Sequence, residues 1–193
     1  MSDRRPDDGM RPKLEATSYQ ARFDALAASG VDVHGEASFV RAYDPATVFD
    51  AGCGTGRVAI ELARHGIDVL GVDVDPAMIA EARRLAPDLR FLERDLAELE
   101  LGRRFEVVVL AGNVPLFCPP PRRRQLIVRS AAHVEPGGVL VTGFQLGRGY
   151  DLAELDEAAT SAGLVLEDRW SSWERAAFVE GGGYAVSTFR STS

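Results

Sequence analysis

A glycine-rich turn between an apolar run and a helical pattern is the feature that most constrains the fold. The turn covers residues 50–56 and reads DAGCGTG. The apolar run 47–51 predicts a strand, and the apolar spacing over 57–65 predicts a helix. Glycine has no Cβ atom, so such a turn can take positive φ and bring its backbone close to a ligand. The start of the helix adds free N–H groups. We therefore expect a strand–turn–helix unit with a ligand site at the turn.

The same alternation of strand and helix patterns continues to residue 162. Two further strand patterns then follow each other without room for a crossover helix, so they should pair antiparallel. The sequence therefore predicts an α/β fold: a doubly wound, Rossmann-like sheet of seven mostly parallel strands with one antiparallel strand, and helices on both faces. Strands are expected over 47–51, 68–72, 89–92, 105–111, 139–144, 164–173 and 184–190, and helices over 15–29, 36–43, 57–65, 76–85, 122–133 and 151–162.

The length of 193 residues fits a single domain. We expect the polar stretch 1–13 to be a disordered lead-in and 14–193 to form the domain, with 14–45 as a helical lid segment. No apolar run approaches the roughly 20 residues of a membrane-spanning helix, and no secretory signal is evident, so a cytoplasmic protein is expected. Cys53 and Cys118 lack metal-ligand spacing and read as reduced thiols, and no metal site is expected.

The charge balance disfavours nucleic acid as a partner. The chain has 22 basic and 29 acidic residues and a net charge of −7, which repels polyanions unless a local basic patch intervenes. The best candidate patch is Arg122, Arg123 and Arg124. A solvated first turn of a helix explains these arginines better than phosphate contacts do.

Three carboxylates stand where successive predicted strands end. Asp50 precedes the glycines, Asp73 ends the second strand, and Asp95 follows the third. Ligands of open α/β sheets bind beyond the carboxyl ends of the strands, and an acid after the second strand can accept from ribose hydroxyls. Asp75, just before Pro76, reads instead as a helix cap. We expect the three acids to share one binding edge.

The glycine spacing argues against a nicotinamide cofactor. The dinucleotide fingerprint G-x-G-x-x-G, counted from Gly52, requires a glycine where this chain has Arg57. Asp50 would also repel a pyrophosphate, whereas it would attract an amine or a sulfonium. A zwitterionic, cationic cofactor is therefore favoured.

The motifs FDAGCGTG, GVDVDP, RDLAEL, VVVLAGNV and EPGGVLV, in this order, closely resemble those of class I S-adenosylmethionine-dependent methyltransferases. The resemblance covers roughly residues 15 to 193, and the first motif is highly specific. A narrower likeness, in Val33-His34-Gly35-Glu36 and Gly112-Asn113, is to small bacterial methyltransferases without an assigned substrate.

The resemblance implies S-adenosylmethionine as cofactor and assigns roles to single residues. Asp50 would hold the methionine amine, directly or through water, and Asp73 would bind the ribose hydroxyls. Asp95 would accept from the adenine amino group, with the Leu96 amide at a ring nitrogen. Further implied contacts come from the glycine turn and the later strand ends: Gly52, Cys53, Gly54, Thr55, Gly56, Val74, Met78, Arg94, Ala111 and Asn113.

The acceptor side is less defined. Catalytic candidates are His34 and Asn113, with Glu36 as a further candidate beside cofactor or substrate. The alternative for His34 is a surface or capping role, and Glu36 could equally sit in the first turn of its helix, where the helix dipole favours an acid. Trp170 and Trp173 read as core or edge cover more readily than as substrate walls.

Methyltransferases that act on nucleobase or glutamine amino groups resemble one another in an Asn/Asp-Pro-Pro-aromatic motif after the fourth strand. This chain has Asn113-Val114-Pro115-Leu116 there, which counts against that class. The favoured hypothesis is methyl transfer to an unidentified acceptor, a small molecule because no long insertion follows the fifth strand. A non-catalytic cofactor sensor or partner subunit, and less readily a nicotinamide oxidoreductase, are the alternatives. The oligomeric state is left open.

Overall fold

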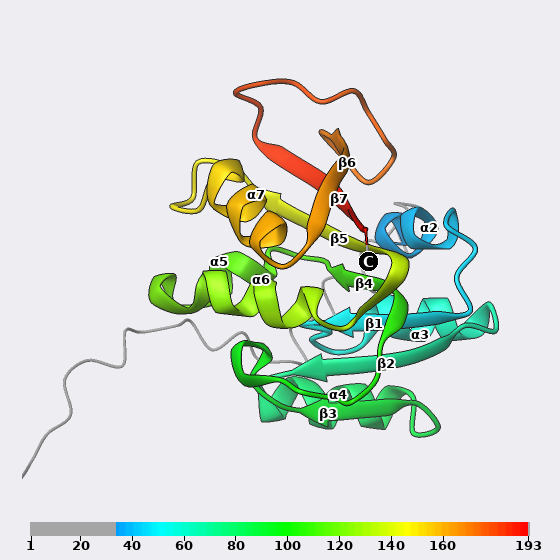
Figure 1. Ribbon diagram of the computed structural model, residues 1–193. Helices are drawn as coiled ribbons and strands as arrows, with labels where there is room; N and C mark the ends of the chain where they lie inside the picture. Colours follow the sequence, from blue (N-terminus) through cyan, green and yellow to red (C-terminus); the bar gives the residue numbers. More distant parts are fainter. Residues whose placement is uncertain (1–33, 193) are drawn as a thin grey trace, which may run out of the picture.

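The computed structural model describes residues 34–192, and they form a seven-stranded sheet with helices on both faces (Figure 1). The strand order is β3-β2-β1-β4-β5-β7-β6. Only β7 runs antiparallel to its neighbours β5 and β6; the other pairs are parallel. This confirms the predicted fold class, including the single reversed strand. The strands are β1 Thr47–Ala51, β2 Asp68–Asp73, β3 Arg90–Glu93, β4 Phe105–Leu110, β5 Val134–Gln145, β6 Leu164–Trp170 and β7 Tyr184–Ser191.

The helices cover the two faces as two separate layers. Helices α2 (Gly35–Arg41), α3 (Arg57–Arg64) and α4 (Pro76–Leu85) contribute their buried side chains to one apolar cluster, and α6 (Arg123–Ala131) and α7 (Leu152–Ser161) contribute theirs to the other. Figure 1 shows α6 and α7 on the opposite side of the sheet from α2 and α3. Shorter helical segments fill the connections: η1 Leu96–Glu98, α5 Val114–Phe117 and η2 Pro120–Arg122.

Strand β4 shows why the sheet must be covered on both faces. Val107 and Val109 belong to the α2–α4 cluster, whereas Val108 and Leu110 belong to the α6–α7 cluster. Alternate side chains of a strand point to opposite faces, so an unbroken apolar run needs two covers. The chain winds outward from β1 through β2 to β3 and then returns to β4 on the other side of β1. The carboxyl ends of β1 and β4 therefore mark the switch point, where such sheets bind ligands.

Strand β5 begins earlier than the sequence predicts. The turn at 136–138 was expected to precede a strand over 139–144, but β5 runs through it from Val134, with a register irregularity opposite Phe105 and Val107. Gly137 has φ +75°, and a Cβ atom on Gly138 would lie 2.7 Å from the Glu106 carbonyl oxygen. The glycines thus make a bulge inside the strand instead of a turn before it.

Helix α2 is part of the core. Its residues Ala37, Phe39 and Val40 are buried under Trp170 and Trp173. The other part of the predicted lid, 14–33, and the helix predicted over 15–29 lie outside the described residues. No helix within 34–192 is long and apolar enough to cross a membrane.

Candidate functional site

The glycine turn after β1 has three glycines with left-handed backbone but different surroundings. Gly52 (φ +85°) lies against Val114, and Gly56 (φ +82°) lies against the Phe91 ring, so a Cβ atom at either position would collide with a side chain. A Cβ atom at Gly54 (φ +53°) would meet no atom within 4 Å. Gly52 and Gly56 are therefore required by packing, whereas Gly54 faces open space. It is the part of the turn that can cradle a ligand.

Asp73, the last residue of β2, holds this turn in place. Its Oδ2 accepts from the Gly54 amide at 2.9 Å, and its Oδ1 accepts from the Asp75 amide at 2.9 Å. Burial raises the pKa of Asp73, while these two hydrogen bonds oppose the rise. A carboxylate offers about four lone-pair sites, so each oxygen keeps one for a further donor. Asp73 can thus bind a diol and position Gly54 at the same time.

Asp50 is the most buried of the three acids, with 1 % of its surface exposed. Its Oδ2 accepts from the Ala59 amide in α3 at 3.2 Å. Burial raises the pKa of Asp50 to about 7; the Arg57 guanidinium and the Ala59 bond oppose the rise, and the charges of Asp73 and Glu36 add to it. A half-ionised, desolvated carboxylate is a site that a cation would stabilise strongly.

Arg57 and Glu36 form a bidentate ion pair beside Asp50. The two guanidinium nitrogens lie 3.0 and 2.5 Å from the two carboxylate oxygens, which joins α2 to the start of α3. The effect of Arg57 on Asp50 was not predicted from the sequence, where Arg57 served only to exclude a dinucleotide cofactor. The signal was present, because Arg57 immediately follows the last glycine of the turn. Glu36, a candidate for contact with cofactor or substrate, faces Arg57.

The residues that follow β2 divide into a cap and an apolar surface. Asp75 caps α4, accepting from the Ala77 amide at 2.8 Å, as predicted. Val74 is 49 % exposed and Met78 is half-buried, so apolar surface is available beside Asp73. Their contact with an adenine ring stays a prediction.

Asp95 is anchored on both oxygens. Oδ1 accepts from the Ala97 amide at 2.9 Å and thereby caps η1, and Oδ2 accepts from Arg122 Nη1 at 2.6 Å. The Arg94 amide donates to the Asp73 carbonyl at 2.9 Å, which joins this loop to the end of β2. The Arg94 side chain is exposed and donates to the Glu93 carbonyl. Leu96 is buried.

The side chains of the other residues predicted to contact the cofactor are less exposed. Cys53 and Thr55 are buried, and burial raises the pKa of the Cys53 thiol well above its ordinary value. Their side chains pack inside the turn, so any contact with a ligand would come from the backbone. Ala111, just after β4, is half-buried.

Asn113 joins the ends of β4 and β5. It has left-handed backbone (φ +69°), its Oδ1 accepts from the Gln145 amide at 2.7 Å, and its own amide donates to the Gly143 carbonyl at 3.2 Å. The adjacent Val114 contacts Gly52, which brings this corner to the glycine turn. His34 Nδ1 lies 3.8 Å from Glu61, in the middle of α3. The catalytic roles of Asn113 and His34 stay predictions.

Trp170 and Trp173 cover α2, as expected. Both rings pack edge-on against Phe39, with centroid distances of 5.2 and 5.4 Å. Trp173 also lies over Gly143 of β5 and donates from Nε1 to the Tyr184 hydroxyl at 3.1 Å.

The interpretation of residues 122–124 as a solvated turn is wrong for Arg123. This residue is only 8 % exposed and donates to the Cys118 and Gly149 carbonyls. Arg122 forms ion pairs with Asp95 and Glu98. Of the three arginines, only Arg124 is exposed. Gly149 lies in a distant loop, so sequence spacing could not reveal this partner of Arg123.

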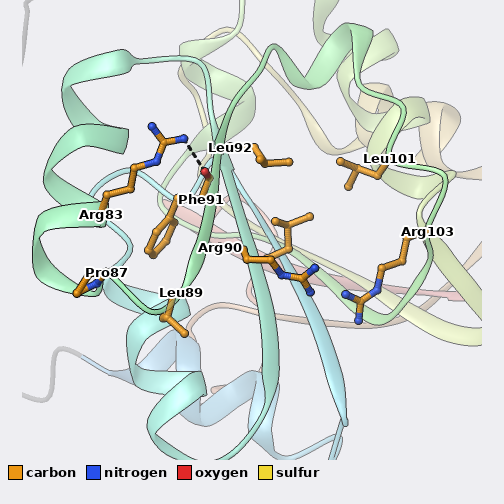
Figure 2. A pocket seen from close by; sticks show the side chains of 9 residues that line it. Arg83, Pro87, Leu89, Arg90, Phe91, Leu92, Leu101 and Arg103 are labelled. Atoms are coloured by element: carbon orange, nitrogen blue, oxygen red, sulfur yellow. Dashed lines mark hydrogen bonds between the residues drawn. The ribbon is translucent and has the colours of Figure 1, made fainter.

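A groove of about 530 Å³ runs along the edge strand β3 (Figure 2). Leu70, Leu92 and Leu101 supply apolar surface, and Arg83 donates to the Phe91 carbonyl, which blocks that point of the strand edge. None of the predicted cofactor or catalytic residues lines it.

The fold and the acidic, glycine-lined switch point define a class of proteins that bind a nucleoside with a cationic tail. A methyltransferase-domain family matches residues 48–138. A TehB-like SAM-dependent methyltransferase from Corynebacterium glutamicum shares 36% identity, with 90% of this chain and 96% of that chain covered and a TM-score of 0.84. The CcbJ methyltransferase from Streptomyces caelestis shares the fold, at 24% identity over 82% of this chain and 90% of that one, with a TM-score of 0.73. The chain belongs to the class I S-adenosylmethionine-dependent methyltransferases.

Curated relatives match over part of their length. Magnesium-protoporphyrin O-methyltransferase of Rhodobacter capsulatus is 43% identical over 84 residues, 41% of this chain and 37% of that protein. The dTDP-3-amino-3,6-dideoxy-alpha-D-glucopyranose N,N-dimethyltransferase of Streptomyces fradiae is 34% identical over 119 residues, 58% and 47% of the two chains. The chain thus spans less than half the length of these two relatives.

Proposed function

We propose that this chain transfers the methyl group of S-adenosylmethionine to a small-molecule acceptor. One observation carries the proposal: Gly54 presents open space directly beside the Asp73 carboxylate, with Asp50 buried next to it. Open space beside a glycine, a diol acceptor and a buried anion together suit a ribose that carries a cationic amino-acid tail.

Each part of the cofactor has a chemically matched partner in this arrangement. Asp73 would accept from the ribose hydroxyls, and Asp50 would stabilise the ammonium of the methionine tail. Val74 and Met78 would pack on the adenine, and Asp95 would accept from its amino group. The donor set fits this cofactor, because the three acids lie at or just after the ends of three neighbouring strands, and Arg57, the cation next to the glycine turn, is engaged by Glu36.

The bound cofactor supplies an electrophilic methyl group on a sulfonium. The chain must align the acceptor with that methyl and keep water away. Asn113 fixes the corner between β4 and β5 that would border the methyl, and α2 with Trp173 closes the neighbouring side. His34 and Asn113 are the proposed acceptor-side residues.

A small acceptor is supported by chemistry and by the relatives' names. The two curated relatives named above act, by their names, on a magnesium porphyrin and a nucleotide-linked amino sugar. In the candidate phosphate-binding patch at 122–124, Arg122 and Arg123 are engaged within the chain, and only Arg124 remains exposed. Cys53 and Cys118 form no disulfide, which suits the reducing cytoplasm of a bacterium.

The test is turnover with the full chain. Incubation with S-adenosylmethionine and a fraction of small bacterial metabolites should release S-adenosylhomocysteine above background. The Asp73→Ala variant should release markedly less at a cofactor concentration that just saturates the wild type. Release no greater than that of the variant, despite measurable cofactor binding by the wild type, would contradict catalysis and favour the sensor alternative.

A further inference from the structure

We propose that Arg122 is a positioning residue for the adenine end of the cofactor, because it fixes the Asp95 carboxylate that accepts a hydrogen bond from the 6-amino group of adenine. The inference rests on the proposed function, which places the adenine at Asp95. Arg122 acts through Asp95 and needs no contact with the cofactor itself.

Two hydrogen bonds determine the orientation of the Asp95 carboxylate. The Ala97 amide is 2.9 Å from Oδ1, and Arg122 Nη1 is 2.6 Å from Oδ2. Rotation about the Cβ–Cγ bond would break both bonds together. Each oxygen keeps a lone pair for one more donor, in a direction that the two bonds define. Without Arg122 the Asp95 carboxylate could rotate while it still caps η1. Arg122 therefore fixes the orientation of Asp95 as an acceptor.

Arg122 is itself held by its surroundings. Its Nη2 donates to Glu98 at 2.8 Å, so the guanidinium bridges both ends of η1. Its backbone amide donates to the Pro119 carbonyl at 2.9 Å. The segment 119–121 is three consecutive prolines, whose rings fix φ and lower the freedom of the chain that presents Arg122.

The ion pair connects two elements that also pack through apolar side chains. Leu96 and Ala97 of η1 are buried in the same cluster as Leu126 and Ile127 of α6. The loop after β3 is thus held against α6 below the surface by packing and at the surface by Arg122.

The ion pair is placed where a ligand can reach it. The side chain of Arg122 is 39 % exposed and that of Asp95 is 33 % exposed. Half-exposed ion pairs contribute little to folding stability, so stability alone explains this bridged geometry poorly. Orienting an acceptor beside a binding loop explains it better.

A fixed anionic acceptor discriminates between purines. Adenine presents an amino donor at position 6, whereas hypoxanthine presents a carbonyl oxygen that Asp95 would repel. A site built to accept a hydrogen bond rejects an analogue that lacks the donor, because its own polar group is left unpaired. The contribution of Arg122 should therefore be visible with adenine and absent with hypoxanthine.

The experiment compares S-adenosylhomocysteine with S-inosylhomocysteine by calorimetric titration. The wild-type chain should bind the adenine ligand at least about tenfold more tightly. Arg122→Met should weaken that binding by about fivefold or more and change the affinity for the inosine ligand less than about twofold. Arg124→Met is the matched control, since Arg124 is an exposed arginine in the first turn of α6, close to Arg122 in the chain and without an ion pair among residues 34–192. It should behave as wild type.

A second variant protects the test against misfolding. Arg122→Lys keeps the charge but cannot bridge Asp95 and Glu98 with a rigid fork, so an intermediate loss for the adenine ligand is expected. An equal loss for both ligands would overturn the proposal, and so would tighter binding, which would mean that Arg122 competes with the adenine. Failure of the wild type to bind either ligand would instead overturn the proposed function, and this inference with it.

Discussion

At the scale of single residues, Asp50 is the most informative side chain. It is buried, its pKa is raised to about 7 by desolvation, and Arg57 only partly offsets the cost of its charge. A ligand ammonium would provide the missing positive charge. Affinity and ionisation should therefore be coupled at this one carboxylate.

The coupling predicts the pH dependence of cofactor binding. Between about pH 5.5 and about pH 7 the ligand amine stays protonated, while Asp50 loses its proton as pH rises. The affinity for S-adenosylhomocysteine should rise by up to about tenfold per pH unit in this window and then level off. Asp50→Asn should bind weakly without this slope. Equal dissociation constants at the two ends of the window, measured by calorimetry on the wild type, would contradict the assignment.

The same group affects stability in the opposite direction without ligand. Its pKa in the folded chain lies above the ordinary value of 3.8, so the folded chain binds the proton more tightly than the unfolded chain does. The resulting stabilisation is complete below about pH 4 and is lost as pH rises through about 7. Urea unfolding across this range should show the loss in the wild type. A wild-type slope as shallow as that of Asp50→Asn would rule out the shift.

Asp73 and Asp75 form a matched pair whose variants distinguish a loss of cofactor binding from a loss of folding stability. Asp73→Ala should weaken S-adenosylhomocysteine binding by about 1–3 kcal/mol, because ribose hydroxyls lose an acceptor and Gly54 loses its anchor. Asp75→Ala removes the cap of α4 and should lower the free energy of unfolding by about 1 kcal/mol. Its dissociation constant should stay near the wild-type value. Similar effects of both variants on binding would remove Asp73 from the site.

At the scale of elements, two glycines of the turn have different roles: Gly52 is required for packing, and Gly54 leaves room for a ligand. A Cβ atom at Gly52 would come within 2.5 Å of Val114, whereas a Cβ atom at Gly54 would project into open space. Gly54→Ala should therefore cost only about 1–2 kcal/mol of backbone strain yet reduce cofactor affinity markedly. Gly52→Ala should be more destabilising and be partly rescued by Val114→Ala. Urea unfolding and calorimetry together check this, and undiminished binding by Gly54→Ala would show that the turn is not the cradle.

The strands and longer helices within 34–192 were predicted correctly because they depend on the local pattern of apolar residues. Apolar runs placed all seven strands, and parallel winding brought Asp50 and Asp73 to one edge. The bulge at Gly137 was missed because it depends on the approach of the Glu106 carbonyl from β4. Helix α5 was missed because four residues around Pro115 carry no helical period. Arg123 was misread because Gly149, one of its partners, is distant in sequence, and the ion pair between Arg122 and Asp95 was not predicted for the same reason.

At the scale of the whole molecule, charge decides which partners are accessible. The net charge is −7, and the arginines at 122 and 123 are neutralised or buried within the fold. We predict no measurable binding to transfer RNA or duplex DNA at physiological salt by fluorescence polarisation. Saturable, salt-sensitive binding would point to a macromolecular acceptor instead of a small one.

The central claim is that an adenosyl group with a cationic tail lies across the carboxyl ends of β1, β2 and β3. The most direct measurement is a crystal structure of the full chain grown with S-adenosylhomocysteine. It should show the ribose hydroxyls on Asp73, the amino group beside Asp50, and the backbone of Gly54 against the ligand. A ligand bound only elsewhere, such as in the groove along β3, with Gly54 facing solvent, would contradict the account.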